Sequence, residues 1–100
     1  SDGFTAKEGL TYAYEGEANI AKRMIERSKK SVALITEEKF NVIENITSVK
    51  SKNIDILITS TKKNNILKPF KEMGIKVINA NKNININKNY NNIIKFNDRK

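Results

Sequence analysis

Cysteine and histidine are both absent from this 100-residue chain. Without these side chains it cannot form a disulfide, a thiolate or imidazole zinc site, or a catalytic triad built on histidine or cysteine. No apolar run approaches the roughly 18 residues that a membrane span requires. No apolar stretch near the first residue resembles a signal peptide, and we therefore expect a cytoplasmic protein.

Sequence motifs for cofactors are lacking as well. No segment has the GxGxxG, Walker A or EF-hand spacing, so we expect neither a nucleotide cofactor nor a metal ion. Hydrophobic residues make up 38% of the chain, which is enough for one small domain with a modest core. The length is too short for an enzyme with separate cofactor and substrate domains.

The net charge of +8 comes entirely from one half of the chain. Residues 1–50 hold 8 basic and 8 acidic residues, whereas residues 51–100 hold 11 basic and 3 acidic residues. Asparagine and isoleucine number 15 each, and this joint bias with lysine can arise from an AT-rich genome. The alternative is a surface that binds phosphate backbones. The compositional explanation is favoured, because the basic half has one arginine, Arg99, and few aromatics that could stack on bases.

Alternating helix and strand patterns predict an α/β fold. A helix is expected from residue 17, because small and apolar residues recur at helical spacing: Ala18, Ala21, Met24, Ile25 and Ser28. Residues 31–36, 54–59 and 75–79 are short apolar runs rich in β-branched residues, typical of strands covered on both faces. This order predicts a mostly parallel, Rossmann-like sheet with flanking helices and right-handed crossovers.

A second helix is predicted between the last two of these strands. Its apolar face consists of four residues, Ile66, Leu67, Phe70 and Met73. Ser60 or Thr61 is the expected N-terminal cap, and Gly74 is the expected terminator. Pro69 lies inside the pattern and predicts either a kink or two short turns.

Three segments have less regular patterns. Residues 6–13 lack a helical stripe, which predicts a loop. Residues 41–53 fit either a short helix or a brief strand at 47–49. Residues 80–92 alternate isoleucine with asparagine, as in a half-exposed edge strand, or form a flexible linker, and residues 93–96 could add one more short strand.

Polar residues follow the predicted strands, where open α/β sheets bind their ligands. The three carboxyl ends carry residues 36–39, 59–63 and 79–81, and the first two combine hydroxyls with lysines. Hydroxyls, a lysine and a nearby helix N-terminus suit an anionic group such as phosphate. The alternative is that the hydroxyls are ordinary turn and cap residues. Glu37 and Glu38 could act as a general acid–base pair, although adjacent loop carboxylates are more often simply solvated.

An ordered set of short motifs over residues 2–80 resembles the effector domain of DeoR-family transcriptional regulators. The motifs that keep the family's order and approximate spacing are Asp2-Gly3, Gly9-Leu10-Thr11, Glu17-Ala18, Met24-Ile25, Lys39-Phe40 and Ile54-Asp55. This chain departs from the family pattern before Lys39, where Thr36-Glu37-Glu38 stands in place of Asp-Ser-Ser. Two extra carboxylates beside Lys39 would repel an anionic ligand.

The resemblance implies the latter part of a phosphorylated-sugar sensor, with a fold similar to ribose-5-phosphate isomerase and glucosamine-phosphate deaminase. It implies a regulator and not an enzyme, with a DNA-binding helix-turn-helix outside this chain. By matched position, Asp2, Lys39 and Glu17 are the expected effector-binding residues. Asp2 would accept a hydrogen bond from a sugar hydroxyl, and Lys39 would neutralise a phosphate. Residues 1–80 are then part of the sensor domain, and residues 81–100 are an Asn/Lys-rich extension that could add an edge strand.

Two other functions stay open on the residues alone. An isomerase- or deaminase-like enzyme would draw its proton-transfer groups from Glu17 and Lys39. A nucleic-acid-binding module would use the basic second half. In each case a truncated sheet would expose an edge and an apolar face, which predicts self-association into a homo-oligomer.

Overall fold

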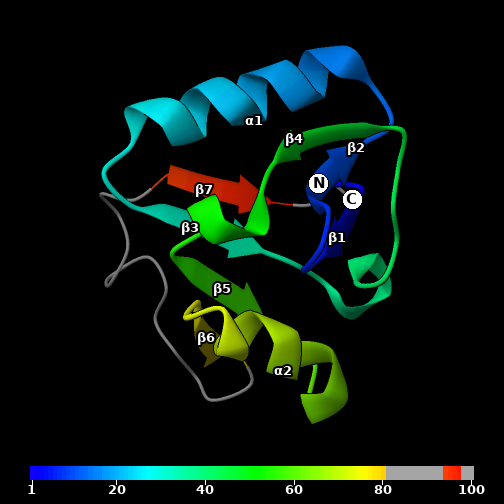
Figure 1. The fold of residues 1–100 in the computed structure, drawn as a ribbon, viewed down its shortest axis with the longest axis vertical. Helices are drawn as coiled ribbons and strands as arrows, with labels where there is room; N and C mark the ends of the chain where they lie inside the picture. The colour runs from blue at the N-terminus through cyan, green and yellow to red at the C-terminus, as the bar shows by residue number, and fades with distance from the viewer. Residues whose placement is uncertain (81–93, 98–100) are drawn as a thin grey trace.

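The computed structural model describes residues 1–80 and 94–97, which form two β-sheets, two α-helices and two short 3-10 helices (Figure 1). An antiparallel sheet has the strand order β1–β2–β4, and a parallel sheet has the order β6–β5–β3–β7. The strands are β1 (Gly3–Thr5), β2 (Gly9–Tyr12), β3 (Ser31–Leu34), β4 (Ile46–Val49), β5 (Ile56–Thr59), β6 (Lys76–Asn79) and β7 (Ile94–Asn97). The helices are α1 (Glu15–Arg27), α2 (Asn64–Glu72), η1 (Glu37–Lys39) and η2 (Ser51–Asn53). The predicted α/β class with a parallel, Rossmann-like sheet is confirmed.

The parallel sheet is built around β3. On one side β3 pairs with β5, and on the other it pairs with β7, where Ser31 lies opposite Ile94. β6 completes the sheet beyond β5. The three strands expected at 31–36, 54–59 and 75–79 are therefore confirmed as neighbouring members of one sheet. The expectations for residues 81–92 lie outside the described residues.

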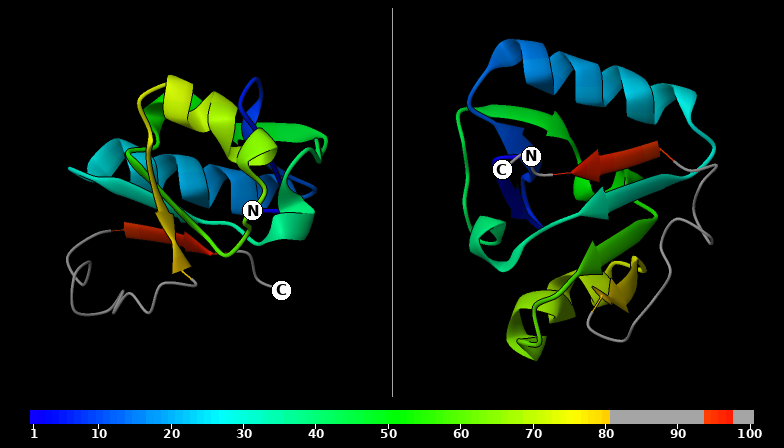
Figure 2. Two further views of the ribbon diagram at one scale, coloured as in Figure 1. Left: turned by 90° about the horizontal axis from the view of Figure 1, so that it is seen from below. Right: turned by 180° about the vertical axis from the view of Figure 1, so that it is seen from behind.

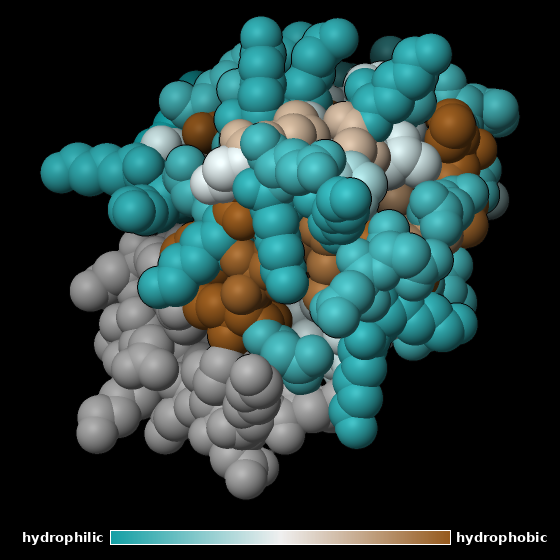
Figure 3. Space-filling model, turned by 60° about the horizontal axis from the view of Figure 1, so that its bottom comes forward, coloured by the Kyte–Doolittle hydropathy of each residue, from teal (hydrophilic) through white to brown (hydrophobic). Residues whose placement is uncertain are grey.

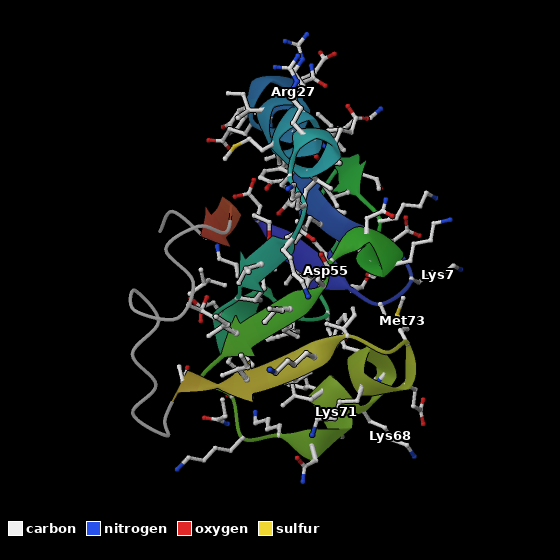
Figure 4. The ribbon with its side chains drawn as sticks, turned by 90° about the vertical axis from the view of Figure 1, so that its left-hand side faces the viewer. Lys7, Arg27, Asp55, Lys68, Lys71 and Met73 are labelled. Carbon is white, nitrogen blue, oxygen red and sulfur yellow. The ribbon has the colours of Figure 1, made fainter. Side chains whose placement is uncertain are left out.

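Successive side chains of the parallel strands point to opposite faces, and the two faces belong to separate clusters of buried residues. Ala33 and Leu57 belong to the larger cluster, which includes residues of both α-helices, whereas Val32 and Ile58 belong to a smaller one. Figures 2 and 4 show both α-helices and the antiparallel sheet on the same side of the parallel sheet. Within residues 1–80 and 94–97, no helix covers the second face.

Helix α1 agrees with the predicted pattern. Ala18 and Ala21 are buried, and Met24 and Ile25 pack against the same core. Acidic side chains occupy its first turn and Arg27 its last, an arrangement that the helix dipole favours. The Ser48 hydroxyl donates a hydrogen bond to the Ala18 carbonyl, which joins β4 to α1.

Helix α2 is continuous through Pro69, so the alternative of two short turns is wrong. Proline removes the donor for the carbonyl of Asn65, and both residues lie on the exposed side of this short helix, where water can satisfy that carbonyl. Gly74 is confirmed as the terminator. Its φ is +89°, and the Ile75 N–H donates to the Phe70 carbonyl at 3.1 Å in a Schellman arrangement.

Two details of the α2 prediction are wrong. The N-cap residue is Lys63, and its side chain makes no capping hydrogen bond, so neither Ser60 nor Thr61 is the cap. Met73 does not join the buried face. It is the C-cap residue, where the chain turns away from the helix, and it is 43% exposed (Figure 4).

The predicted loop over residues 6–13 is also wrong, because most of it belongs to a β-hairpin. β1 and β2 pair in antiparallel register, with Phe4 opposite Leu10. All four residues of β2 are buried, including the polar Thr11, and the strand is too short for an alternating pattern to stand out in the sequence. Gly9 makes the tight return possible. Its φ is +79°, and a Cβ there would lie 2.0 Å from the Val49 carbonyl oxygen.

The ambiguous segment at residues 41–53 is resolved in favour of a strand. β4 pairs with β2, with Leu10 opposite Val49, and the 3-10 helix η2 follows. Pairing with the unpredicted hairpin decides this outcome, because the segment alone supports both patterns.

Three aromatic rings join distant parts of the larger cluster. Phe4 stacks on Phe70 with ring centroids 4.6 Å apart, and Phe40 lies 5.7 Å from Phe70 and 6.0 Å from Phe4. The cluster therefore links β1, α2 and the segment that follows η1. On the outside, Figure 3 shows hydrophilic residues over most of the visible face, with apolar residues reaching the surface between them.

Candidate functional site

The carboxyl ends of β3, β5 and β6 meet at one edge of the parallel sheet, because the three strands run in the same direction. Past the end of β3, the Ile35 N–H donates to the Ile58 carbonyl at 3.0 Å. At the end of β6, the Asn79 side-chain amide donates to the Thr61 carbonyl at 3.1 Å. The three polar segments predicted to meet here, residues 36–39, 59–63 and 79–80 among the described residues, are thus brought to one edge.

Thr61 is buried at this edge and hydrogen-bonded to its neighbours along the chain. The residue is 1% exposed, and its N–H donates to the hydroxyl oxygen of Thr59 at 3.3 Å. Its own hydroxyl oxygen accepts from the Lys63 N–H at 3.3 Å, one residue before α2 begins. These short hydroxyl–backbone bonds define the path of the chain from β5 into α2.

Glu37 reaches this edge from a different element, the 3-10 helix η1 that follows β3. One carboxylate oxygen, Oε1, accepts a hydrogen bond from the Thr61 hydroxyl at 2.9 Å. The other, Oε2, lies 2.7 Å from Nζ of Lys63. Both carboxylate oxygens therefore have a donor from the β5–α2 loop. We refer to Glu37, Thr61 and Lys63 as the edge triad.

The edge triad keeps Glu37 ionised. The hydrogen bond from Lys63 is the largest cause that lowers the pKa of Glu37 below the ordinary value of 4.5, and the bond from Thr61 lowers it further. A general acid needs a pKa raised toward neutrality, so this shift has the wrong direction for the acid–base role that the sequence left open for Glu37 and Glu38. What the edge triad offers is a cation and a fixed hydroxyl, a combination that holds anionic oxygens.

Asp2, the first of the predicted effector-binding residues, makes a structural contact. Its Oδ2 accepts from the Ala13 N–H at 2.8 Å, and its own N–H donates to the Thr11 carbonyl at 3.0 Å. The side chain is partly buried and joins the first residues of the chain to the end of β2. One carboxylate oxygen is thus engaged with the backbone.

Lys39 and Glu17 come from two further elements. Lys39 is the last residue of η1 and partly buried, and the next residue, Phe40, forms a bridge with Phe4 of β1. Lys39 therefore lies on a segment next to the strand that Asp2 precedes. Glu17 lies in the first turn of α1 and is partly buried. Whether these three residues bind an effector stays a prediction.

Sequence reasoning identified the carboxyl edge but did not select Thr61 and Lys63 as site residues. The available signal was a buried strand followed directly by three hydroxyl residues and two lysines at positions 59–63. Which of these side chains point to the same place depends on the turn between β5 and α2.

Asp55 was matched only as part of a motif, and its role is structural (Figure 4). Its Oδ2 accepts from the Ser31 N–H at 2.9 Å.

Among residues 1–80 and 94–97, no group of three or more Asp, Glu, His or Cys residues is arranged to hold a metal ion. None of the helices among residues 1–80 has the length and apolar character needed to cross a membrane.

The fold and this edge define an α/β domain with a polar, lysine-bearing edge at the carboxyl ends of its parallel strands. No protein-family model matches the chain. No solved structure matches it either. Among curated proteins, the chain is 38% identical over 76 residues to the HTH-type transcriptional regulator GolR of Listeria innocua. The aligned segment covers 75% of this chain and 30% of that regulator, so the chain spans less than a third of the curated relative's length. The chain is therefore similar to part of a transcriptional regulator.

Proposed function

We propose that the chain is the ligand-sensing portion of a DNA-binding transcriptional regulator of the DeoR family and that its effector is a phosphorylated sugar. The observation that carries this proposal is the 38% identity to the regulator GolR. The α/β fold agrees with a sensor domain of that kind. DNA binding would then belong to a helix-turn-helix outside these residues, in a cytoplasmic protein.

The carboxyl edge supports the anionic character of the effector. Lys63 and the hydroxyl of Thr61 hold a carboxylate there, and the partly buried Lys39 belongs to the same 3-10 helix as Glu37. Lys39 is the residue proposed to neutralise the phosphate, with Asp2 and Glu17 contributing to the sugar side. Because one oxygen of Asp2 is occupied by Ala13, only its second oxygen would face a ligand.

The sensor interpretation is preferred over the two alternatives from the sequence. An isomerase- or deaminase-like enzyme would rely on Glu17 and Lys39 for proton transfer, whereas the curated protein to which the chain is similar is a transcriptional regulator. A nucleic-acid-binding module remains the alternative for the basic second half. Salt-dependent DNA binding by the 100-residue chain alone would favour it. Self-association stays part of the proposal, and light scattering of the purified chain tests it.

The test uses the natural protein that contains this chain. A panel of phosphorylated sugars and the matching unphosphorylated sugars is screened by thermal shift and by release of labelled operator DNA. An effector present at 100 times its dissociation constant stabilises the folded sensor by about 2.7 kcal/mol. Lys39→Ala is expected to abolish this gain, whereas Lys52→Ala, a change of another lysine, which is exposed, leaves it intact. A panel that neither stabilises the protein nor releases DNA would refute sugar-phosphate sensing.

A further inference from the structure

We infer that Glu37 is a built-in competitor: its carboxylate occupies an anion-binding position formed by Lys63 and Thr61, and an incoming phosphate group binds there only by displacing it. The inference deepens the proposed function, because it rests on the effector being anionic. It adds Lys63 and Thr61 to Lys39 as groups that would hold the phosphate, and it identifies Glu37 as the residue with which the anion must compete. It also gives Glu37, one of the two carboxylates before Lys39, a specific role.

The donors and the acceptor at this position come from two different segments of the chain. Both donors, the Lys63 ammonium group and the Thr61 hydroxyl, belong to the β5–α2 loop, while the acceptor comes from η1. Each oxygen of Glu37 takes one donor, at 2.7 Å and 2.9 Å. A phosphate group presents several anionic oxygens with the same charge and the same demand for donors, so it can replace the carboxylate without any change in the loop.

The loop between β5 and α2 is held by hydrogen bonds that do not involve the Glu37 side chain. Thr61 is almost completely buried and is held through its own backbone, by Thr59 on one side and by Asn79 on the other. Its hydroxyl oxygen also accepts from the Lys63 N–H. None of these bonds uses the Glu37 side chain. The Thr61 hydroxyl and the backbone that carries Lys63 are therefore preorganised, and the current occupant of the position is replaceable.

The ion pair between Lys63 and Glu37 is exposed to water. The side chains of Lys63 and Glu37 are 60% and 44% exposed, so water surrounds the ion pair and screens it. Glu37 also lies in a 3-10 helix of only three residues, Glu37–Lys39. An exposed pair on a short turn opens more readily than a buried one. An anion can thus enter this position. Its apparent affinity equals its intrinsic affinity multiplied by the fraction of molecules in which Glu37 has left the position.

The experiment titrates the 100-residue chain with inorganic phosphate and follows the backbone amide signals of Thr61 and Lys63 by NMR. Glu37→Gln removes the charge but keeps the size of the side chain. Glu38→Gln is the matched control, because it makes the same charge change on the neighbouring residue of η1. If Glu37 occupies the position in nine of ten molecules, Glu37→Gln should bind phosphate about tenfold more tightly than the wild type. Glu38→Gln should bind like the wild type.

A second pair of variants tests the donors. The gain in Glu37→Gln should disappear when Lys63→Met is added and should survive when Lys62→Met, a change of the adjacent exposed lysine, is added instead. Far-UV circular dichroism verifies folding of each variant. If Glu37→Gln fails to fold, Glu37→Ala is titrated in the same way. Equal phosphate affinity in wild type and Glu37→Gln, an equal gain in Glu38→Gln, or a gain that persists without Lys63 would each overturn the inference.

Further titrations separate this inference from the proposed function. Pentose and hexose phosphates are compared with free phosphate and with the unphosphorylated sugars on the same variants. Tight phosphate binding by Glu37→Gln, with no sugar phosphate releasing DNA from the natural protein, would support the competitor role of Glu37 and refute sugar-phosphate sensing. The opposite result is that sugar phosphates release DNA from the natural protein while free phosphate binds Glu37→Gln no more tightly than the wild type. That result would refute the competitor role of Glu37 and would support the proposed sensor.

Discussion

The two ends of the β3–β5 pair are both joined by a carboxylate and a hydroxyl, but they are built differently. At the amino end, Asp55 accepts from the backbone N–H of Ser31, and the Ser31 hydroxyl donates to the Asn53 carbonyl at 2.7 Å. At the carboxyl end, the Glu37 carboxylate bonds, within the described residues, to the side chains of Thr61 and Lys63. The amino end thus ties backbone to side chain and stabilises the sheet, whereas the carboxyl end can lose its carboxylate with the backbone unchanged.

The largest effect is expected from the aromatic cluster, which joins β1, α2 and the segment that follows η1. Phe70→Ala removes the ring that stacks on Phe4 and leaves a cavity next to Phe40, so the free energy of unfolding should fall by about 3–5 kcal/mol. Urea denaturation measures this loss. Met73→Ala, an exposed apolar residue at the same helix end, should change it by less than about 0.5 kcal/mol. Similar losses in both variants would contradict the assignment of Phe70 to the core.

The amino end should respond next. Asp55→Ala leaves the N–H of buried Ser31 without its carboxylate acceptor, and we expect a loss of about 1–3 kcal/mol in the free energy of unfolding. Asp55→Asn keeps an oxygen acceptor and should lose less. Urea denaturation at neutral pH checks both variants. A variant Asp55→Ala as stable as the wild type would mean that the amino end is not the stabilising one.

The carboxyl end should be far less sensitive. In Glu37→Gln the loop is still held by Thr59 and Asn79, so its urea midpoint should stay close to that of the wild type. A loss as large as that of Asp55→Ala would show that both ends contribute equally to stability, which would contradict this prediction.

The smallest effect is a shift in a titration. The pKa of Glu37 is lowered in the folded protein by Lys63 and Thr61. Its stabilising contribution is therefore present above the ordinary value of 4.5 and is lost as the pH falls through the lower folded value. NMR titration of the Glu37 carboxyl carbon should give a midpoint below 4.5, and Lys63→Met should move it upward. An unchanged midpoint in Lys63→Met would remove Lys63 as the main cause.

The parallel sheet could be predicted from the sequence because its signals are local. Three apolar, β-branched runs separated by helical or polar segments favour one arrangement, and Gly74 marks the helix end that its backbone requires. The hairpin β1–β2 could not be predicted in this way. Its second strand is buried throughout and only four residues long, and its partner on the far side, β4, comes from a segment that is itself ambiguous.

The location of the site was predicted more successfully than the residues that form it. Strand ends with hydroxyls and lysines indicated the edge where Thr61 and Lys63 lie, since parallel strands share their carboxyl edge. The partners within that edge depend on side-chain direction after the strand. Residue types and spacing do not determine that direction, which is why Glu37 could be proposed as an acid–base residue although it is held by a lysine. Asp2, matched by motif, turned out to bond the backbone of Ala13.

The pairing of β7 with β3 has a consequence for synthesis of the chain. Ser31, near the end of the first third, lies opposite Ile94, so one side of β3 acquires its partner only after the ribosome has translated residues 94–97. Until then β3 presents unpaired backbone groups to any other strand nearby. Nascent chains that stall before residue 94 should therefore be the ones that need a chaperone, and those that extend past residue 97 should need it less.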